Sequence, residues 1–348
     1  MARPIEHPVQ AAARIERELA PLIKGVKDPL VRAEMERKIR EARERLDSAA
    51  EEQPGEVVEK GFMDFFRDMA AGRRSRERLR HLRKSLRARG ADVDDFGYDA
   101  VYWQEIQPRI RYLYDTYWRV ETSGIENIPA EGRALIVANH SGLLPWDAVI
   151  LREAVQIEHP NQRDLRPLIE DFAYALPYLS GFLRRAGIAR ADRRNAERML
   201  REEKLVAVFP EGARGAAKMF RDRYRIQRFG RAGTVRLAIA TQSPIIPAAI
   251  VGGEETHPVL AKSDLLAKWL GLPVFPITPT FPWLGPGGLV PLPSKWYVRF
   301  GEPIRPDRKA GADPGDEIRI NQLNEALRQR IQKMVHDVLR ERRSVWRG

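Results

Sequence analysis

Cysteine is absent from this 348-residue sequence, and this absence excludes disulfide bonds, thiolate metal sites and a cysteine nucleophile. The N-terminal segment has no apolar core of signal-peptide length, so we do not expect export by that route. No apolar run reaches the roughly 20 residues that a membrane-spanning helix needs. These absences fit a reducing compartment, and a protein that lies on any membrane it meets.

Negative charge is in the minority, because the formal net charge is +12. The positive electrostatic potential that this net charge produces attracts anions, including lipid headgroups, nucleic acid and acidic carrier proteins. Residues 73–89 contain nine Lys or Arg residues against one acid, with Leu79, Leu82 and Leu86 on one helical face. A basic amphipathic helix suits an anionic membrane surface, although a solvated helix docked on the main domain fits equally well. We find no recognised nucleic-acid-binding module, so nucleic acid is not an expected partner.

The chain divides into two parts at about residue 97. Residues 1–97 have a charged helical pattern whose apolar stripe is too thin for a coiled coil, so we predict a helical appendage. We expect this appendage to bind a membrane or a partner. Residues 98–348 begin with a predicted helix over 98–118 and end with one over 316–343. Between them, helical patterns alternate with predicted strands at 134–138, 167–169, 187–189, 205–209, 245–250 and 296–300. This alternation predicts an α/β domain around a largely buried sheet.

His140 stands apart from the other five histidines, which lie in charged helical surroundings or in loops before a proline. It follows the predicted strand 134–138 directly, and Asp147 comes seven residues later. A polar cluster between a strand and a helix is where α/β folds place active sites. On a continuous helix the two residues would lie about 10 Å apart along the axis. Residues 141–144 must therefore form a loop if His140 and Asp147 are to share a hydrogen bond.

The segment Asn139-His140-Ser141-Gly142-Leu143-Leu144-Pro145-Trp146-Asp147 resembles the signature of the glycerolipid acyltransferases typified by 1-acylglycerol-3-phosphate acyltransferase. That signature is Asn-His, four residues and Asp, whereas six residues separate the pair here. Three further segments resemble later blocks of the family in the family's order: residues 181–196, 209–215 and 245–250. The resemblance covers residues 124–303. It implies the family's fold, a mixed sheet flanked by helices, for the 98–348 domain.

The resemblance also implies roles for individual residues. Glu211 and Gly212 would contact the glycerol end of the acceptor, and Pro247 would lie on the acyl-donor side of the site. Arginines would hold the substrate phosphate, because their planar fork matches it at two points. The arginines that match the family's blocks are Arg190, with Arg193 and Arg194 as its neighbours, and Arg214.

Histidine suits the chemistry that the resemblance implies, because its pKa lies near neutrality. His140 would take the proton from the acceptor hydroxyl as that oxygen attacks a thioester carbonyl. Asp147 would fix the imidazole tautomer and stabilise the imidazolium. No enzyme nucleophile is needed, and the sequence has no Gly-x-Ser-x-Gly elbow. We expect neither a metal nor a cofactor, with acyl-CoA or acyl carrier protein as co-substrate.

The leading hypothesis is therefore an O-acyltransferase of phospholipid biosynthesis that acylates lysophosphatidic acid at a membrane surface. The altered spacing between His140 and Asp147 keeps other acceptors open: a diacylglycerol, a long-chain alcohol or an aminolipid. A non-catalytic lipid-binding protein on the same scaffold is the alternative from another class. It does not explain why His140 and the Glu211-Gly212 pair are both intact.

Residues 269–294 form an uncharged segment with seven prolines. Proline at this density excludes a spanning helix. Aromatic residues in the segment favour contact with the membrane interface, or shelter for the acyl chain, over a buried connection. We expect a cytoplasmic protein in peripheral or monotopic contact with the inner face of the membrane.

Overall fold

The computed structural model describes residues 93–170, 174, 179–216, 218–230, 232–263, 265–267, 274–305 and 317–347. Residues 1–92 of the predicted appendage, which include the basic segment 73–89, and residues 269–273 of the proline-rich segment lie outside the described residues. Within the described part, residues 93–276 and 291–347 belong to one compact unit and residues 277–290 to another.

The larger unit is built around a seven-stranded mixed sheet with the strand order β1-β9-β6-β2-β5-β3-β4. Neighbouring strands are parallel, except that β6 and β9 are antiparallel. β2 lies at the centre of the sheet, and all five of its residues are buried. The carboxyl ends of β2, β3, β5 and β6 meet at one edge, which we call the carboxyl edge. The strands are β1 (Glu121–Ser123), β2 (Ala134–Ala138), β3 (Leu165–Ile169), β4 (Ala189–Arg190), β5 (Leu205–Val208), β6 (Ile245–Val251) and β9 (Tyr297–Phe300), with β7 (Ala261–Lys262) and β8 (Pro276–Ile277) outside this sheet.

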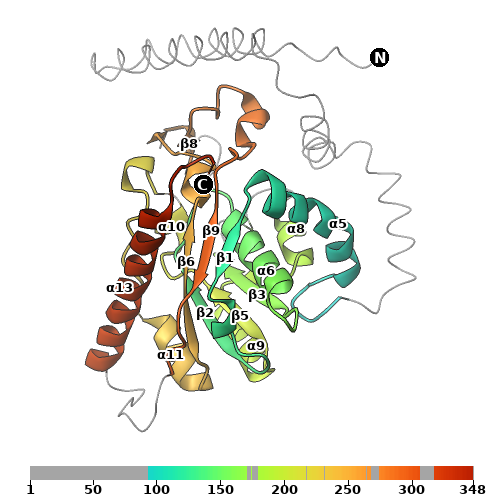
Figure 1. Ribbon diagram of the computed structural model, residues 1–348, viewed down its shortest axis with the longest axis vertical. Helices are drawn as coiled ribbons and strands as arrows, with labels where there is room; N and C mark the ends of the chain where they lie inside the picture. Colours follow the sequence, from blue (N-terminus) through green and yellow to red (C-terminus); the bar gives the residue numbers. More distant parts are fainter. Residues whose placement is uncertain are drawn as a thin grey trace. The chain divides into compact units, whose positions relative to one another are not determined.

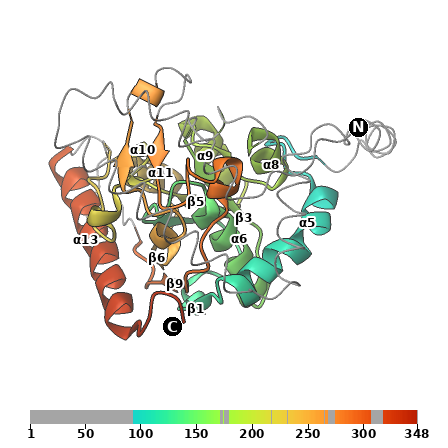
Figure 2. The same ribbon diagram turned by 90° about the horizontal axis from the view of Figure 1, so that it is seen from above.

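Helices cover both faces of the sheet. Helices α9, α11 and α13 share one core cluster with Leu135 and Val137 of β2, whereas α6 packs against β3 and α5 packs against α6. Figure 1 shows α13 and α6 on opposite sides of the sheet, and Figure 2 places α6 between the sheet and α5. The α-helices are α5 (Ala100–Tyr112), α6 (Trp146–Glu158), α8 (Leu179–Arg185), α9 (Arg193–Arg201), α10 (Ala213–Ala216), α11 (Gly233–Thr241) and α13 (Glu317–Glu341). A π-helical turn, Leu113–Tyr117, extends α5, and short 3-10 turns lie at Ile125–Asn127, Phe220–Asp222, Gly253–Glu255 and Gly285–Leu289.

Successive side chains of β2 point to opposite faces of the sheet and so divide the core into two parts. Leu135 and Val137 point toward α9, α11 and α13, so the alternate residue Ile136, which is fully buried, points toward the other face. From α13, the residues Leu327, Ile331 and Val335 pack into the same cluster, at the spacing of one helical face. Each such fully buried aliphatic side chain contributes about 1.5–3 kcal/mol.

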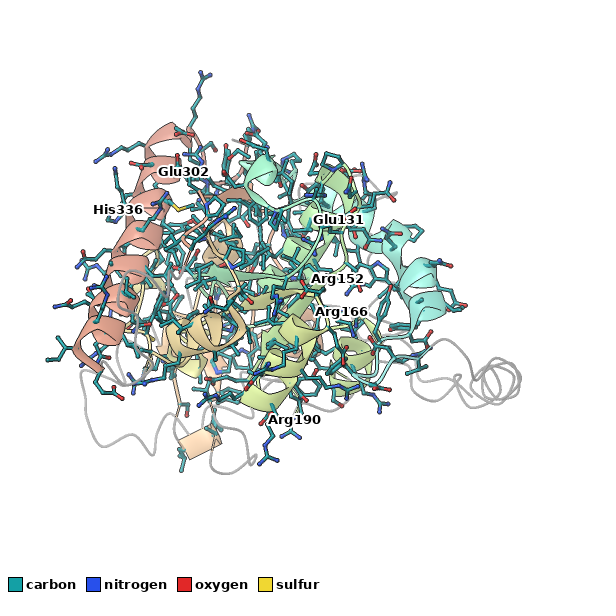
Figure 3. The ribbon with its side chains drawn as sticks, turned by 90° about the horizontal axis from the view of Figure 1, so that it is seen from below. Glu131, Arg152, Arg166, Arg190, Glu302 and His336 are labelled. Atoms are coloured by element: carbon teal, nitrogen blue, oxygen red, sulfur yellow. The ribbon has the colours of Figure 1, made fainter. Side chains whose placement is uncertain are left out.

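A buried cationic pair ties the beginning of this unit to the sheet. Arg152 of α6 and Arg166 of β3 lie close together (Figure 3), and both guanidinium groups pack on the ring of Tyr98, with their central carbons 4.6 and 4.3 Å from its centroid. Asp164 accepts from both arginines. Such desolvated cation–π contacts stabilise by about 2 kcal/mol each. Residues just before α5 are therefore part of this unit.

The predicted α/β class and mixed sheet are confirmed. Each of the six predicted strands has its counterpart, and the predicted helix 316–343 corresponds to α13. The predicted helix 98–118 corresponds to α5 and its π-helical turn. β1 was not predicted, because three polar residues carry no strand signal.

Residues 277–290, taken by themselves, form an irregular segment held by local hydrogen bonds. Thr278 organises it: its backbone N–H donates to the Phe281 carbonyl (2.7 Å), and its hydroxyl accepts from the Phe281 N–H (2.8 Å). The hydroxyl of Thr280 donates to the carbonyl of Gly288 (2.9 Å). Among the helices of the described residues, none is long and apolar enough to cross a membrane.

Candidate active site

His140 and Asp147 meet in the loop that joins β2 to α6. Nδ1 of His140 lies 2.5 Å from Oδ2 of Asp147, whose side chain is fully buried. The same oxygen accepts a hydrogen bond from the backbone N–H of Ser141 (2.9 Å). Gly142 has a φ of 105°, a left-handed conformation that glycine adopts without strain. The chain therefore forms the expected loop before α6 begins, and the longer spacing does not keep the pair apart.

Charged neighbours set the protonation of His140. Burial disfavours the imidazolium, but the charge and hydrogen bond of Asp147, together with the charge of Glu211, outweigh burial and raise the pKa of His140 above its ordinary value. Lys218 acts in the opposite direction. When the ring is neutral, an Nδ1–H that donates to Asp147 leaves the lone pair on Nε2. This is the tautomer that a general base needs.

Asn139 fixes the loop to the neighbouring strand. Its side-chain amide donates to the carbonyl of Ile250 (2.9 Å) and accepts from the N–H of the same residue (2.7 Å). The side chain thus takes the place of a backbone partner at the end of β6. We did not predict this role for Asn139 from the sequence. Its position between the predicted strand and His140 was the feature that could have indicated it.

Glu211 supports the backbone of His140. Its Oε1 accepts from the His140 N–H (2.8 Å), and its Oε2 accepts from the Gln227 N–H (2.6 Å). Its side chain is fully buried, and it is not among the residues that line the cavity described next. The expected contact of Glu211 with the glycerol end of a substrate stays a prediction; in the structure its carboxylate accepts from the backbone of His140.

A cavity of about 360 Å³ opens beside His140. Its wall is largely apolar, and its charged residues are Glu170, Asp192 and Arg193. Gly212 also lines the cavity; it has a φ of 58°, and a Cβ there would clash with the carboxylate of Glu170. Glu170 in turn accepts from the Ala213 N–H (2.8 Å). The apolar lining residues include Leu168, Ile169, Ala196, Val208, Phe209 and Leu237.

The arginines expected at a substrate phosphate lie in different places. Arg193, the first residue of α9, lines the His140 cavity. Arg190 lines a second cavity, of about 390 Å³, and lies at the periphery of the view in Figure 3. Arg214 is exposed on α10 and lines neither of these cavities. Pro247 lies within the sheet, paired with Val137 of β2, and does not line the His140 cavity.

Gly215 of α10 marks a point where the site has no room for a side chain. A Cβ there would lie 2.7 Å from the Cβ atoms of both His140 and Glu211. A Cβ at this position must push at least one of the two residues aside. Hydrogen bonds hold both of them, so we expect Gly215→Ala to displace His140 at a cost in stability. The predicted effects are a loss of kcat of about tenfold or more and a destabilisation of about 1–3 kcal/mol. Kinetics and thermal unfolding would measure both.

The matched control is Gly287→Ala, because a Cβ on Gly287 would meet nothing within 4 Å. A stable Gly215→Ala protein with the kcat of the unaltered chain would contradict the packing of α10 against His140.

Comparison with known proteins adds to this geometry. Residues 119–251 match the family model named Acyltransferase. An uncharacterized protein of Mycobacterium leprae is 47% identical over 257 residues, which cover 74% of this chain and 70% of that protein. A human protein named DGAT1/2-independent enzyme synthesizing storage lipids is 27% identical over 252 residues, covering 70% of this chain and 74% of that protein.

Among solved structures, the chain is similar to the 1-acyl-sn-glycerophosphate acyltransferase PlsC from Thermotoga maritima. The TM-score is 0.46 and the identity 19%, over 70% of this chain and 81% of that chain.

Proposed function

Because this chain belongs to the acyltransferase family, we propose that it moves a fatty acyl group from a thioester to a glycerolipid hydroxyl, with His140 as the general base. The observation that carries the proposal is the buried contact of 2.5 Å between His140 and Asp147, beside a mainly apolar cavity that His140 lines. The donor is acyl-CoA or acyl carrier protein. No metal or cofactor takes part in the proposed reaction.

The proposed reaction needs one proton carrier. Nε2 of His140 takes the proton from the acceptor hydroxyl as its oxygen attacks the thioester carbonyl. Asp147 stabilises the imidazolium that forms. The tetrahedral intermediate then collapses, the C–S bond breaks, and the leaving thiolate takes from His140 the proton that came from the acceptor hydroxyl. The products are the ester and the free thiol of the donor.

Lysophosphatidic acid is the first acceptor that we propose. Arg193 lines the His140 cavity, and its guanidinium forms no ion pair with the described carboxylates, so it is available to a phosphate. We expect Arg193→Ala to raise the KM for lysophosphatidic acid about tenfold or more, since a hydrogen bond to a charged group contributes about 1.5–3 kcal/mol. The kcat should change little. Steady-state kinetics with this acceptor would measure both constants.

The control is Arg194→Ala, the exposed neighbour that does not line the cavity. If both variants kept the KM of the unaltered chain, Arg193 would not be the phosphate ligand.

A neutral lipid alcohol such as a diacylglycerol is the second candidate acceptor. The observation that favours it is the charge of the cavity, where two acids, Glu170 and Asp192, accompany the one arginine. The name of the human relative, which refers to storage lipids, points the same way. A neutral acceptor predicts product from diacylglycerol and a KM for it that Arg193→Ala leaves unchanged.

We also propose that the reaction takes place at an anionic membrane surface. The net charge of +12 supports this, and so do exposed apolar side chains that include Leu260, Leu265, Val345 and Trp346. Leu260 and Leu265 lie in the chain that follows β6 beyond the carboxyl edge. In the transfer assay, turnover should rise with the anionic lipid fraction of the vesicles and fall as salt is added. A rate that depends on neither would count against the membrane proposal.

A further inference from the structure

Three charged side chains are buried together next to His140. Nζ of Lys218 lies 3.2 Å from Oε2 of Glu211 and 2.9 Å from Oε1 of Glu254. The exposed fractions of these side chains are 5% for Lys218, 0% for Glu211 and 6% for Glu254, so water screens them little. We call these three residues the Lys218 cluster.

The Lys218 cluster joins loops that leave different strands at the carboxyl edge. Glu211 follows β5 and accepts from the backbone N–H of His140 (2.8 Å), which follows β2. Glu254 follows β6 and accepts from the N–H of Tyr224 (2.6 Å). Lys218 is the cation that the two carboxylates share. The backbone of His140 is therefore held through Glu211, while its ring is held by Asp147.

The charges of the cluster depend on one another. Burial works against the ammonium, but Glu254 and Glu211 outweigh it and raise the pKa of Lys218 above its ordinary value, so Lys218 is charged. Burial raises the pKa of Glu254 to about 7 even with Lys218 beside it. Without the ammonium, two buried carboxylates would share a site that cannot keep both ionised. Whichever took up a proton, Glu211 would lose the cation that fixes it between the loops.

We infer that Lys218 is a positioning residue of the active site: its ammonium holds the Glu211 carboxylate in place, and Glu211 holds the backbone of His140. The inference rests on the proposed role of His140 as the general base. Lys218 has no contact with the substrate in this account, so its loss should impair the chemical step and leave acceptor binding almost unchanged.

The test compares Lys218→Met and Lys218→Arg on anionic vesicles with labelled palmitoyl-CoA. We expect Lys218→Met to lower kcat about 10- to 100-fold, because small displacements of a catalytic group have effects of this size, and to change KM less than about twofold. Lys218→Arg keeps the charge and should recover most of the kcat. Lys333→Met, on the exposed side of α13, is the control and should behave like the unaltered chain.

A second variant covers the case in which Lys218→Met does not fold. Lys218→Met with Glu254→Gln removes one charge of each sign, which relieves the repulsion and leaves the net charge of the cluster unchanged. Glu211 still lacks its ammonium in this double variant, so its kcat should stay low. A double variant with the kcat of the unaltered chain would mean that Lys218 only offsets Glu254, and it would overturn the inference.

Two further outcomes would also overturn the inference: a folded Lys218→Met protein with unaltered kcat, or equal losses in the Met and Arg variants. His140→Ala, assayed in parallel, separates the two proposals. An active His140→Ala protein would overturn the proposed mechanism, whereas an inactive one beside a fully active Lys218→Met protein would overturn the role of Lys218 alone.

Discussion

Replacement of His140 by alanine is expected to lower kcat by about 10²- to 10⁴-fold, the usual contribution of a general base. The expected loss lies in the chemical step, because the variant has no group that can take the acceptor proton at the position of Nε2. The protein should still fold, because Asp147 keeps the N–H groups of Ser141 (2.9 Å) and Ala148 (2.8 Å) as hydrogen-bond donors. Kinetics and thermal unfolding on the same preparation would measure both effects.

His336→Ala is the matched control for this variant. His336 is an exposed histidine of α13 whose ring pairs with Gln332 (3.2 Å). We expect it to retain full activity. A folded His140→Ala protein with the turnover of His336→Ala would contradict general-base catalysis by His140.

Asp147→Asn is expected to produce the second large effect, again a loss of about 10²- to 10⁴-fold in kcat. An amide in place of the carboxylate can present its NH₂ to Nδ1 of His140 and so favour the tautomer with its proton on Nε2, which cannot act as a base. The amide also removes the negative charge that stabilises the imidazolium. Because Asp147 is fully buried, water would not replace it.

The pH dependence of Asp147→Asn provides a separate test. Acyl transfer needs the neutral imidazole, so activity falls as the pH drops through the pKa of His140. In the unaltered chain that pKa is raised, mainly by Asp147 acting against burial. Without the carboxylate the burial effect prevails, and the acidic limb of the kcat profile should move to lower pH. A limb that stays in place or moves to higher pH would contradict the direct pairing of the two side chains.

The course of the main chain was largely predictable, because the buried strands are short apolar runs and α13 has a clear apolar stripe. The apolar run 134–138 predicted β2 with its observed bounds. The sheet is covered on both faces, so all five residues of this strand are buried and apolar. β1 escaped prediction for the opposite reason. Its three residues, Glu121–Ser123, are polar. They form a strand because they pair with β9, which is distant in the sequence, and such pairing cannot be predicted from the local sequence.

The active site was predictable only where its residues are close in sequence. His140 and Asp147 are seven residues apart in one loop, so the position of His140 after a strand was a usable signal. Lys218 and Glu254 are 36 residues apart, and they meet only because the segments that follow β5 and β6 converge at the carboxyl edge. The arginines show the same limit: Arg190 and Arg193 are neighbours in the sequence, yet they line different cavities.

Transfer of radiolabelled palmitate from palmitoyl-CoA on anionic vesicles, with lysophosphatidic acid and diacylglycerol as separate acceptors, tests the central claim most directly. The assay compares the unaltered chain with His140→Ala. Our account predicts labelled ester from the unaltered chain with at least one of the two acceptors, and a rate about 10²- to 10⁴-fold lower from His140→Ala. Equal amounts of ester from both proteins would contradict it.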